Sequence, residues 1–295
     1  MKTQIIAEIG INFAYGNDKS KFLDNAKKLI DVACVAGCDY VKFQKRDPDV
    51  CVPEAEKLKA KRVPWREEET TYLQYKYDIE FGQSEYDEIH KYCREKGIGW
   101  FASVWDKNSV DFMKRYSTHF MMENEEQNPA IVMKIPSALI TDIDLCEYAR
   151  ENCNYLIVST GMSTEEEIEE CVRNCFPNVI MHTNSSYPSK NEELRLDYIQ
   201  YLKHKWGNSA EVGYSGHEFG LMTTIAATVI GAKWIERHIT LDRTLWGSDQ
   251  MASVEPQGLI KLVKSIRDIE NARGGFEPRA VFGSELDKRK SLRGK

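Results

Sequence analysis

Short apolar runs rich in β-branched residues alternate with amphipathic segments of helical period along the chain, and this alternation is what most constrains its fold. Eight of these runs are candidate strands, namely QIIAEIG (4–10), YVKFQ (40–44), IGWFASV (98–104), IVMKIPS (131–137), YLIVST (155–160), NVIMHTN (178–184), EVGYS (211–215) and KWIERHI (233–239). Helical patterns follow nearly every run; one spans 21–37 and stops at Gly37, and another, 163–175, opens with a capping box. Eight βα units with right-handed crossovers predict a (β/α)8 TIM barrel in a single domain, 1–295, with an open doubly wound sheet as the alternative.

A long charged and aromatic segment, 45–83, interrupts this pattern between the second strand and its helix. Loops of this length are usually functional or disordered. Because the segment follows the carboxyl end of a strand, which is the active face of such barrels, we expect it to cover a substrate. The alternative is a peripheral or oligomer-contacting excursion. At the far end of the chain, 283–295 is a basic tail that we expect to be solvated.

Composition excludes several classes of function. With 42% hydrophobic and 29% charged residues and a formal net charge of −6, the chain resembles an ordinary globular protein and shows no nucleic-acid footprint. It has neither a signal peptide nor about 18 consecutive apolar residues, which predicts a cytoplasmic protein with no membrane span. In that compartment its eight cysteines should be free thiols. Cys34/Cys38 and Cys171/Cys175 each lie four apart on predicted helices, but neither pair has the second Cys/His pair that structural zinc requires.

Polar residues stand at the end of nearly every candidate strand. In a barrel the carboxyl ends of the strands converge on one mouth, so residues far apart in sequence can form a single site there. These candidates are Glu8, Asn12, Lys42, Gln44, Ser103, Asp106, Lys134, Ser137, Ser159, Thr160, His182, Asn184, Ser185, Ser215, His217, Glu236 and His238. Each alone has a structural interpretation, because a lone histidine is usually a hydrogen-bonded core residue and a lone lysine usually reaches solvent.

Two lysines lie inside apolar strands, Lys42 in VKF and Lys134 in MKI. An unpaired ammonium is costly to bury, so both lysines require an anion. Together with the strand-end hydroxyls and the backbone N–H groups at helix starts, they would form a cradle for a phosphate, or for a phosphate and a carboxylate.

Two histidines, His217 and His238, end the adjacent seventh and eighth strands, close enough to hold one divalent ion. Imidazole suits Mn²⁺, Co²⁺, Zn²⁺ or Fe²⁺ better than Ca²⁺. Two histidines alone are a weak signal for a metal. Glu8, Glu236 and Asp249 strengthen it as acids that could hold water or orient the ligands.

A set of motifs in constant order, from about residue 4 to 293, resembles the sialic acid synthase family. The motifs are AEIGINF (7–13), DYVKFQ (39–44), KIPSA (134–138), VSTGMST (158–164), HTNSSYP (182–188), VGYSGHEFG (212–220), IERHITLD (235–242) and GSDQMASVEP (247–256). Members of this family condense phosphoenolpyruvate with N-acetylmannosamine or a related sugar to make nonulosonic acids.

The resemblance implies roles for the matching residues. The residues implied to bind phosphoenolpyruvate are Lys42, Lys134, Ser137, Ser159, Ser185 and Ser215, with Ser103 added from its strand-end position. His217 and His238 would be metal ligands, for Mn²⁺ first and Mg²⁺ or Co²⁺ as alternatives. The implied catalytic acids are Glu8, Asp249 and, behind His238, Glu236; Gln44 and Tyr187 would face the sugar.

Three departures from the family pattern affect these expectations. The segment SALITD (137–142) lacks the glycine and glutamate that often follow the serine, and SDQ (248–250) stands where many members read PDH. Bacterial members usually carry a C-terminal antifreeze-like domain that places an arginine over the partner subunit's sugar site, and we expect this chain to lack it. A homodimer is implied by the family, and either the 45–83 insertion or a separate lid polypeptide could replace that domain.

The sequence therefore predicts a metal-dependent transferase that joins phosphoenolpyruvate to a hexosamine-like or hexose-like aldose, unphosphorylated or 6-phosphorylated. It leaves the acceptor open among N-acetylmannosamine, its 6-phosphate, mannose and the diacetamido-trideoxy sugars that lead to legionaminic and pseudaminic acids. A barrel aldolase with Lys42 or Lys134 as Schiff base is a second hypothesis, although its two histidines would be idle. A catalytically silent barrel that binds sugar phosphates or a partner enzyme is a third.

Overall fold

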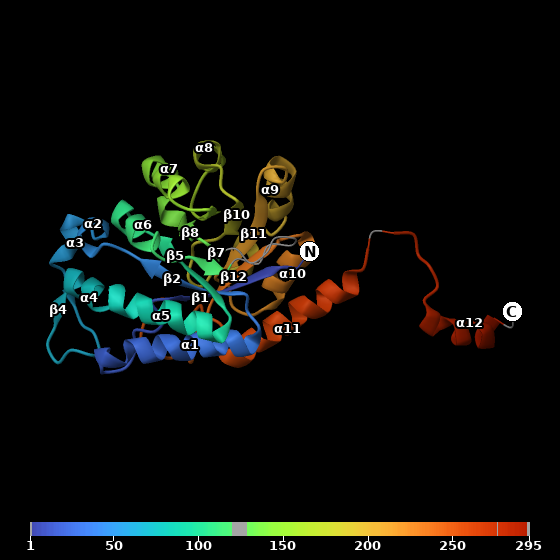
Figure 1. Ribbon diagram of the computed structural model, residues 1–295, viewed down its shortest axis with the longest axis horizontal. Helices are drawn as coiled ribbons and strands as arrows, with labels where there is room; N and C mark the ends of the chain where they lie inside the picture. The colour runs from blue at the N-terminus through green and yellow to red at the C-terminus, as the bar shows by residue number, and fades with distance from the viewer. Residues whose placement is uncertain (1, 120–128, 276, 294–295) are drawn as a thin grey trace.

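Eight parallel strands close into a barrel in the computed structural model, which describes residues 2–119, 129–275 and 277–293 (Figure 1). Within these residues the barrel strands are β1 (Gln4–Gly10), β2 (Tyr40–Lys45), β5 (Gly99–Val104), β8 (Val132–Ile135), β9 (Tyr155–Ser159), β10 (Val179–Thr183), β11 (Glu211–Gly216) and β12 (Trp234–His238). They are hydrogen-bonded in the order β1-β12-β11-β10-β9-β8-β5-β2. All eight predicted strands are confirmed, and the alternative of an open sheet is wrong because β1 pairs with both β2 and β12.

Helices on the outside follow the barrel strands along the chain, as the βα pattern predicts (Figure 1). They are α1 (Phe22–Ala36), α5 (Gln83–Lys96), α6 (Lys107–Met113), α7 (Ile143–Glu151), α8 (Glu165–Cys175), α9 (Tyr198–Trp206), α10 (Met222–Ile230) and α11 (Pro256–Arg273). Helix α1 ends because Gly37 adopts φ 83°, a left-handed conformation that favours glycine. Helix α8 begins at the predicted capping box, in which Thr164 and Glu167 bond each other's backbone N–H groups.

The barrel lumen is filled in layers, and its layers differ in polarity. An apolar cluster that includes Ile6, Tyr40, Phe101 and Trp234 fills the half nearest the strand N-termini. Because side chains alternate along a strand, the residue two positions after a lumen-facing residue also faces the lumen. After Tyr40 that residue is Lys42, so the strand-end half of the lumen is charged while the other half is apolar. This layering places the polar residues at the mouth.

The 45–83 insertion is ordered and rests on loops of the strand-end face. It contains α2 (Pro48–Cys51), α3 (Glu54–Lys57), the antiparallel pair β3 (Ala60–Lys61) and β4 (Thr70–Thr71), and α4 (Tyr72–Asp78). Buried Asp78 holds it together by accepting hydrogen bonds from Arg66 and from Trp65 Nε1. The Trp65 ring also packs edge-on against Trp246, in the loop after β12, with ring centroids 5.0 Å apart.

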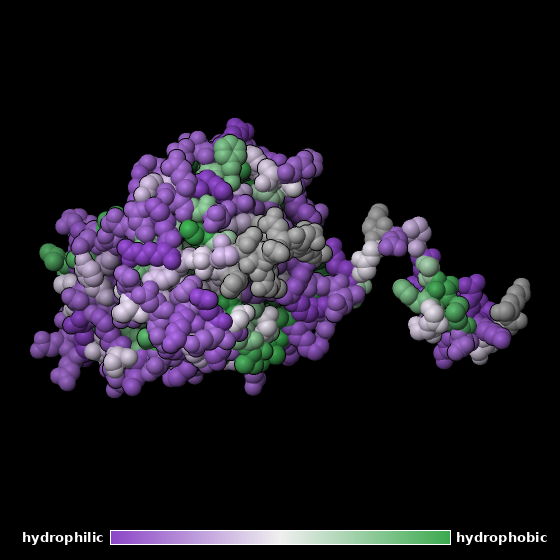
Figure 2. Space-filling model, in the orientation of Figure 1, coloured by the Kyte–Doolittle hydropathy of each residue, from purple (hydrophilic) through white to green (hydrophobic). Residues whose placement is uncertain are grey.

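The remaining elements lie outside the barrel. They are the pair β6 (Thr118–His119) and β7 (Pro129–Ala130), the 3-10 helices Lys19–Lys21, Ser137–Leu139, Asn191–Glu193 and Gly283–Glu285, and α12 (Leu286–Arg293). Helix α12 stands away from the barrel beyond the end of α11 (Figure 1). Phe282, just before this helix, and Leu292, within it, are exposed apolar side chains. Figure 2 shows a green, hydrophobic group on this outlying segment.

The structure also tests the predictions of free cysteines, of cysteine pairs on shared helix faces, and of no membrane span. All eight cysteines are free. Cys171 and Cys175 share a face of α8, with Sγ atoms 3.6 Å apart, whereas Cys38 lies beyond the end of α1, so the predicted common helix face with Cys34 is wrong. Among the described helices, none combines the length and the apolar character needed to cross a lipid bilayer.

Candidate active site

A cavity of about 180 Å³ lies at the strand-end mouth of the barrel and collects the predicted site residues. Its lining contains every residue predicted to be catalytic, substrate-binding or metal-ligating except Asp249. The predicted residues in it are Glu8, Lys42, Gln44, Ser103, Lys134, Ser137, Ser159, Ser185, Tyr187, Ser215, His217, Glu236 and His238. Eight strands with their loops thus build one site, as barrel geometry requires.

Lys42 and Lys134 are fully buried, and each has a carboxylate partner from another strand. Lys42 Nζ lies 2.7 Å from Glu8 Oε2 and donates to Ser103 Oγ at 2.9 Å. Lys134 Nζ donates to Glu236 Oε1 at 2.7 Å, and Ser215 Oγ donates to the same oxygen at 3.1 Å. The anion that each buried lysine requires is therefore supplied within the protein, because Glu8 and Glu236 balance the two ammonium charges.

The charge balance sets the protonation of this network. Burial alone would raise the pKa of Glu236, but the ammonium groups of Lys134 and Lys42 hold it well below its ordinary value. Burial would lower the pKa of Lys42, yet the carboxylates of Glu236 and Glu8 outweigh it and the pKa is raised. For Lys134, burial together with the charge of Lys42 outweighs Glu236, so its pKa is lowered. The two lysines thus differ in how firmly each holds its proton.

Besides Glu8 Oε2, which forms an ion pair with Lys42, three buried polar atoms of the predicted site residues in the cavity have no hydrogen-bond partner within the described part of the chain. They are Ser159 Oγ, Glu236 Oε2 and His238 Nδ1. Buried polar groups in native proteins are almost always bonded to protein, water or ligand. Orphaned atoms gathered in one cavity therefore indicate a binding site for a polar molecule.

Hydroxyl groups from two loops lie close to Gly161, which belongs to a third loop. Gly161 N donates to Ser137 Oγ at 3.1 Å, and a Cβ at position 161 would come within 2.1 Å of Ser185 Oγ. Only glycine leaves room for these two hydroxyls, so the VSTGMST motif supplies a place where backbone and hydroxyls can approach an anion closely. Gly161 was not predicted as a site residue, although that motif contained it.

His217 and His238 lie side by side, with ring centroids 5.4 Å apart. His217 Nδ1 is 2.6 Å from the carbonyl oxygen of Asn184; a carbonyl only accepts, so Nδ1 carries the proton and Nε2 keeps its lone pair. Burial, together with neighbouring His238, lowers the pKa of His217 to about 3, which keeps the imidazole neutral at neutral pH. Tyr187 stacks on His217 with ring centroids 4.0 Å apart.

The residues present fit a divalent cation held by two imidazoles. His238 Nδ1 is unbonded, His217 is in the tautomer that a metal ligand needs, and Asp249 Oδ2 lies 3.8 Å from His238 Nδ1. Within the described ranges no group of three or more His, Cys, Asp or Glu side chains is arranged to hold a metal ion. A metal here would therefore complete its coordination with water or substrate oxygens rather than with further side chains.

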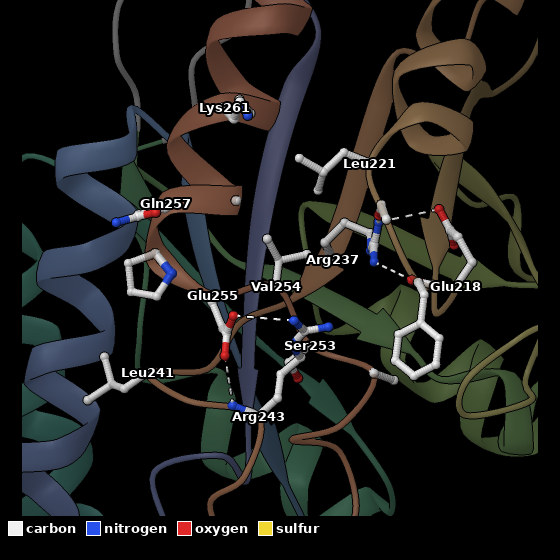
Figure 3. A pocket seen from close by; sticks show the side chains of 15 residues that line it. Glu218, Leu221, Arg237, Leu241, Arg243, Ser253, Val254, Glu255, Gln257 and Lys261 are labelled. Atoms are coloured by element: carbon white, nitrogen blue, oxygen red, sulfur yellow. Dashed lines mark hydrogen bonds and ion pairs between the residues drawn. The ribbon is translucent and has the colours of Figure 1, made fainter.

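A buried ion pair joins the two histidine-bearing segments behind the cavity. Arg237, between Glu236 and His238, faces away from the lumen and lies 3.3 Å from Glu218, the residue after His217. Figure 3 shows Arg237 pointing toward Glu218 in a neighbouring cavity of about 700 Å³. Arg237 also donates to the backbone oxygens of Glu218 and Gly220. None of the predicted site residues lines that larger cavity, and neither Arg237 nor Glu218 lines the cavity at the barrel mouth.

Several strand-end candidates do not line this cavity, namely Asn12, Asp106, Thr160, His182 and Asn184. Three of them, Thr160, His182 and Asn184, line another cavity of about 560 Å³ that shares Ser185 with it. Asn12 Nδ2 donates to Ser253 Oγ and to the backbone oxygen of Ile239, and Asp106 caps α6. The structure adds lining residues that sequence reasoning missed, namely Trp105, Pro136, Ala138, Met162 and Thr183. Apart from Thr183, which ends β10, these residues lie beyond the strand ends and have apolar or aromatic side chains, which give no polar signal by which to find them.

The closed barrel, with its charged and partly unsatisfied mouth, places the protein in the (β/α)8 class. A family model described as the NeuB family matches residues 29–277. Human N-acetylneuraminate-9-phosphate synthase is 33% identical over 92% of this chain and 71% of its own length. The N,N'-diacetyllegionaminic acid synthase of Campylobacter jejuni is 32% identical over 92% of this chain and 78% of its own length.

Solved structures agree with these matches. An N-acetylneuraminic acid (sialic acid) synthetase from Leptospira borgpetersenii, in complex with citrate, has a TM-score of 0.80 and 30% identity, covering 100% of this chain and 94% of that one. A truncated 3-deoxy-D-arabino-heptulosonate 7-phosphate synthase from Thermotoga maritima, 11% identical with a TM-score of 0.61, shares the fold. The chain belongs to the NeuB family. It is an enzyme of the sialic acid synthase type, which confirms the resemblance found in the sequence.

Proposed function

We propose that the protein condenses phosphoenolpyruvate with the open-chain form of an N-acetylmannosamine-like aldose, giving a nonulosonic acid and inorganic phosphate. The observation that carries this proposal is the set of orphaned atoms, Ser159 Oγ, Glu236 Oε2 and His238 Nδ1, in a cavity that also holds two lysines. Its relatives carry the names of synthases for sialic and legionaminic acids.

The anionic partner would bind in the cationic half of the cavity. Ser137, Ser185 and the N–H of Gly161 lie where they can bond phosphate oxygens. Lys42 and Lys134 would share their protons between the substrate's anionic groups and the glutamates that they now contact. Because these donors are already in place, their orientation costs little during the reaction.

The bond changes follow from holding the two substrates together. C3 of phosphoenolpyruvate attacks the aldehyde carbon to form the new C–C bond, and the aldehyde oxygen takes up a proton. Water adds to C2 with loss of a proton, which Glu8 or Glu236 can accept because both carboxylates line the cavity. The tetrahedral intermediate then loses phosphate by C–O cleavage. Overall, phosphoenolpyruvate, aldose and water give a 2-keto acid and phosphate.

His217 and His238 are the residues that would hold a divalent cation, with Mn²⁺ first and Mg²⁺ or Co²⁺ as alternatives. When bound there, such an ion supplies Lewis-acid polarisation of a carbonyl oxygen. Asp249, near His238, and Tyr187, over His217, would orient the acceptor, and Gln44 reaches the same cavity from β2.

A Schiff-base aldolase receives support from one observation, the lowered pKa of Lys134. A neutral amine is needed for that chemistry, and Lys134 instead forms a buried ion pair with Glu236. Borohydride reduction in the presence of pyruvate decides between the two, because only an aldolase would be trapped as a covalent adduct.

The experiment that tests the proposal measures phosphate release from phosphoenolpyruvate with N-acetylmannosamine, its 6-phosphate and mannose, each with Mn²⁺ and with chelator. Release that needs both a sugar and the metal supports the proposal. Absence of release with every sugar, from folded and metal-loaded protein, would contradict it and favour a barrel that only binds sugar phosphates.

A further inference from the structure

A second cavity, also of about 180 Å³, adjoins the reaction cavity and is built largely by the 45–83 insertion. The two cavities share Gln44 and Trp105 as walls. Gln44 also links them by bonding, since its Nε2 donates to Glu8 and its Oε1 accepts from Arg46. A ligand that extends from the reaction cavity past Gln44 would therefore enter the second cavity.

Arg46 presents a cation to this second cavity without a carboxylate partner in the described residues. Its guanidinium lies over the Trp105 ring, 3.7 Å from the centroid, and its Nε is buried without a hydrogen-bond partner there. Nearby Glu80 is committed elsewhere, because it contacts Lys45 Nζ at 2.6 Å. The fixed guanidinium plane with a free N–H suits a bidentate oxyanion.

Lys76 presents a second cation, from α4. Its Nζ lies 5.2 Å from the Tyr72 ring and 5.1 Å from the Tyr75 ring, and it has no ion pair with any side chain that the structure describes. Burial and the neighbouring Arg46 lower the pKa of Lys76 to about 8, with Lys61 adding to the effect. Glu80 also lines this cavity but is already paired with Lys45, so two half-buried cations lie there without a carboxylate of their own, which indicates that a further anion belongs between them.

Two other cations of the insertion have carboxylate partners within it, in contrast to Arg46 and Lys76. Arg66 contacts Asp78, and Lys45 contacts Glu80, both at 2.6 Å. Arg46 and Lys76, which line the cavity, are left for a ligand. We infer that they form a subsite for the phosphate group at the far end of a 6-phosphorylated aldose acceptor, whose uncharged middle passes Gln44. This inference rests on the proposed function and names the acceptor class for that same site.

Kinetics with a matched pair of acceptors tests the subsite. We expect kcat/KM for N-acetylmannosamine 6-phosphate to exceed that for N-acetylmannosamine by at least ~10-fold, as two charge-assisted contacts would give. Lys76→Met and Arg46→Gln should each lower this ratio about 10-fold, whereas Lys59→Met, at an exposed lysine of the same insertion paired with Glu56, should leave it unchanged. Lys76→Arg keeps the charge and should restore most of the preference.

The outcomes separate this inference from the proposed function. Turnover of N-acetylmannosamine with little use of its 6-phosphate would overturn the subsite and leave the synthase proposal intact. An unchanged ratio in folded Lys76→Met and Arg46→Gln proteins would also overturn it, because the two cations would then only pack on aromatic rings. If N-acetylmannosaminuronate were used as efficiently as the 6-phosphate, the subsite would be one for carboxylates, and its assignment to a phosphate group would be wrong. Only the absence of phosphate release from phosphoenolpyruvate with every one of these acceptors would count against the synthase proposal itself.

Discussion

Lys134 Nζ donates to Glu236 Oε1 at 2.7 Å, and this contact crosses the barrel lumen. The two residues belong to β8 and β12, which are separated by β9, β10 and β11 in the barrel. Ser215 and Lys42 approach the same carboxylate oxygen, at 3.1 Å and 3.7 Å. Glu236, two residues before His238 on β12, therefore connects side chains from three other strands, β8, β11 and β2.

A single and a double substitution in the Lys134–Glu236 pair should affect stability and activity differently. Lys134→Met leaves Glu236 buried with a weaker partner and should lower the free energy of unfolding by about 3 kcal/mol. The double variant Lys134→Met/Glu236→Gln should recover much of that loss, because no unpaired charge remains. Its turnover should stay at least ~10²-fold below that of the unchanged protein. Urea unfolding and phosphate release measure the two effects, and recovery of activity in the double variant would contradict a role in binding substrate.

The two histidines should govern metal content. His217→Ala and His238→Ala should each lose tightly bound Mn²⁺ after dialysis, since each would remove half of the protein ligands. His204→Ala, at an exposed position of α9, is the matched control and should retain the metal of the unchanged protein. Elemental analysis of the purified proteins gives the stoichiometry. Equal metal content in all three variants would remove the histidines from the metal site.

The Arg237–Glu218 pair should be a structural requirement of the site. Both side chains are almost fully buried, so Arg237→Met would leave Glu218 as an uncompensated charge and cost about 3–5 kcal/mol of stability. By contrast, Arg243→Met breaks the exposed pair with Glu255 seen in Figure 3 and should cost less than about 1 kcal/mol. Thermal and urea unfolding of metal-free protein measure both. Similar costs for the two variants would contradict the burial argument.

The cationic subsite should give a pH dependence specific to phosphorylated acceptors. The pKa of Lys76 is lowered to about 8 by burial and by Arg46, with Lys61 acting in the same direction and Asp249 and Glu80 opposing it. Its positive charge is present below that pH and is lost above it. We expect kcat/KM for N-acetylmannosamine 6-phosphate to fall between about pH 7.5 and 9 more steeply than kcat/KM for N-acetylmannosamine. Lys76→Arg should abolish the difference, and identical profiles for both acceptors would exclude Lys76.

The barrel could be predicted because its determinants are local. Each strand contains its own β-branched run, and helix boundaries such as Gly37 and Thr164 have distinct capping chemistry. The strand-end rule then brought Glu8, Lys42 and His238 into one cavity without any knowledge of distances. Period-two alternation also explains why Arg237, between Glu236 and His238, faces the other side of β12.

The remaining features depend on contacts that periodicity does not encode. The pairing of Lys134 with Glu236 across the lumen follows from the closure and stagger of the barrel, which no single strand determines. The cavity between Arg46 and Lys76 depends on how the insertion folds back, and its charged sequence has no regular period. A homodimer and a separate lid polypeptide stay predictions, as does the identity of the metal.

The central claim is tested most directly by following the bridging oxygen of phosphoenolpyruvate. Substrate labelled with ¹⁸O between C2 and phosphorus is turned over with N-acetylmannosamine or its 6-phosphate, and the released phosphate is weighed by mass spectrometry. Condensation with C–O cleavage predicts that the label leaves in phosphate, together with a nine-carbon 2-keto acid in equal amount. Unlabelled phosphate released with pyruvate, and no new C–C bond, would show P–O hydrolysis and contradict the account.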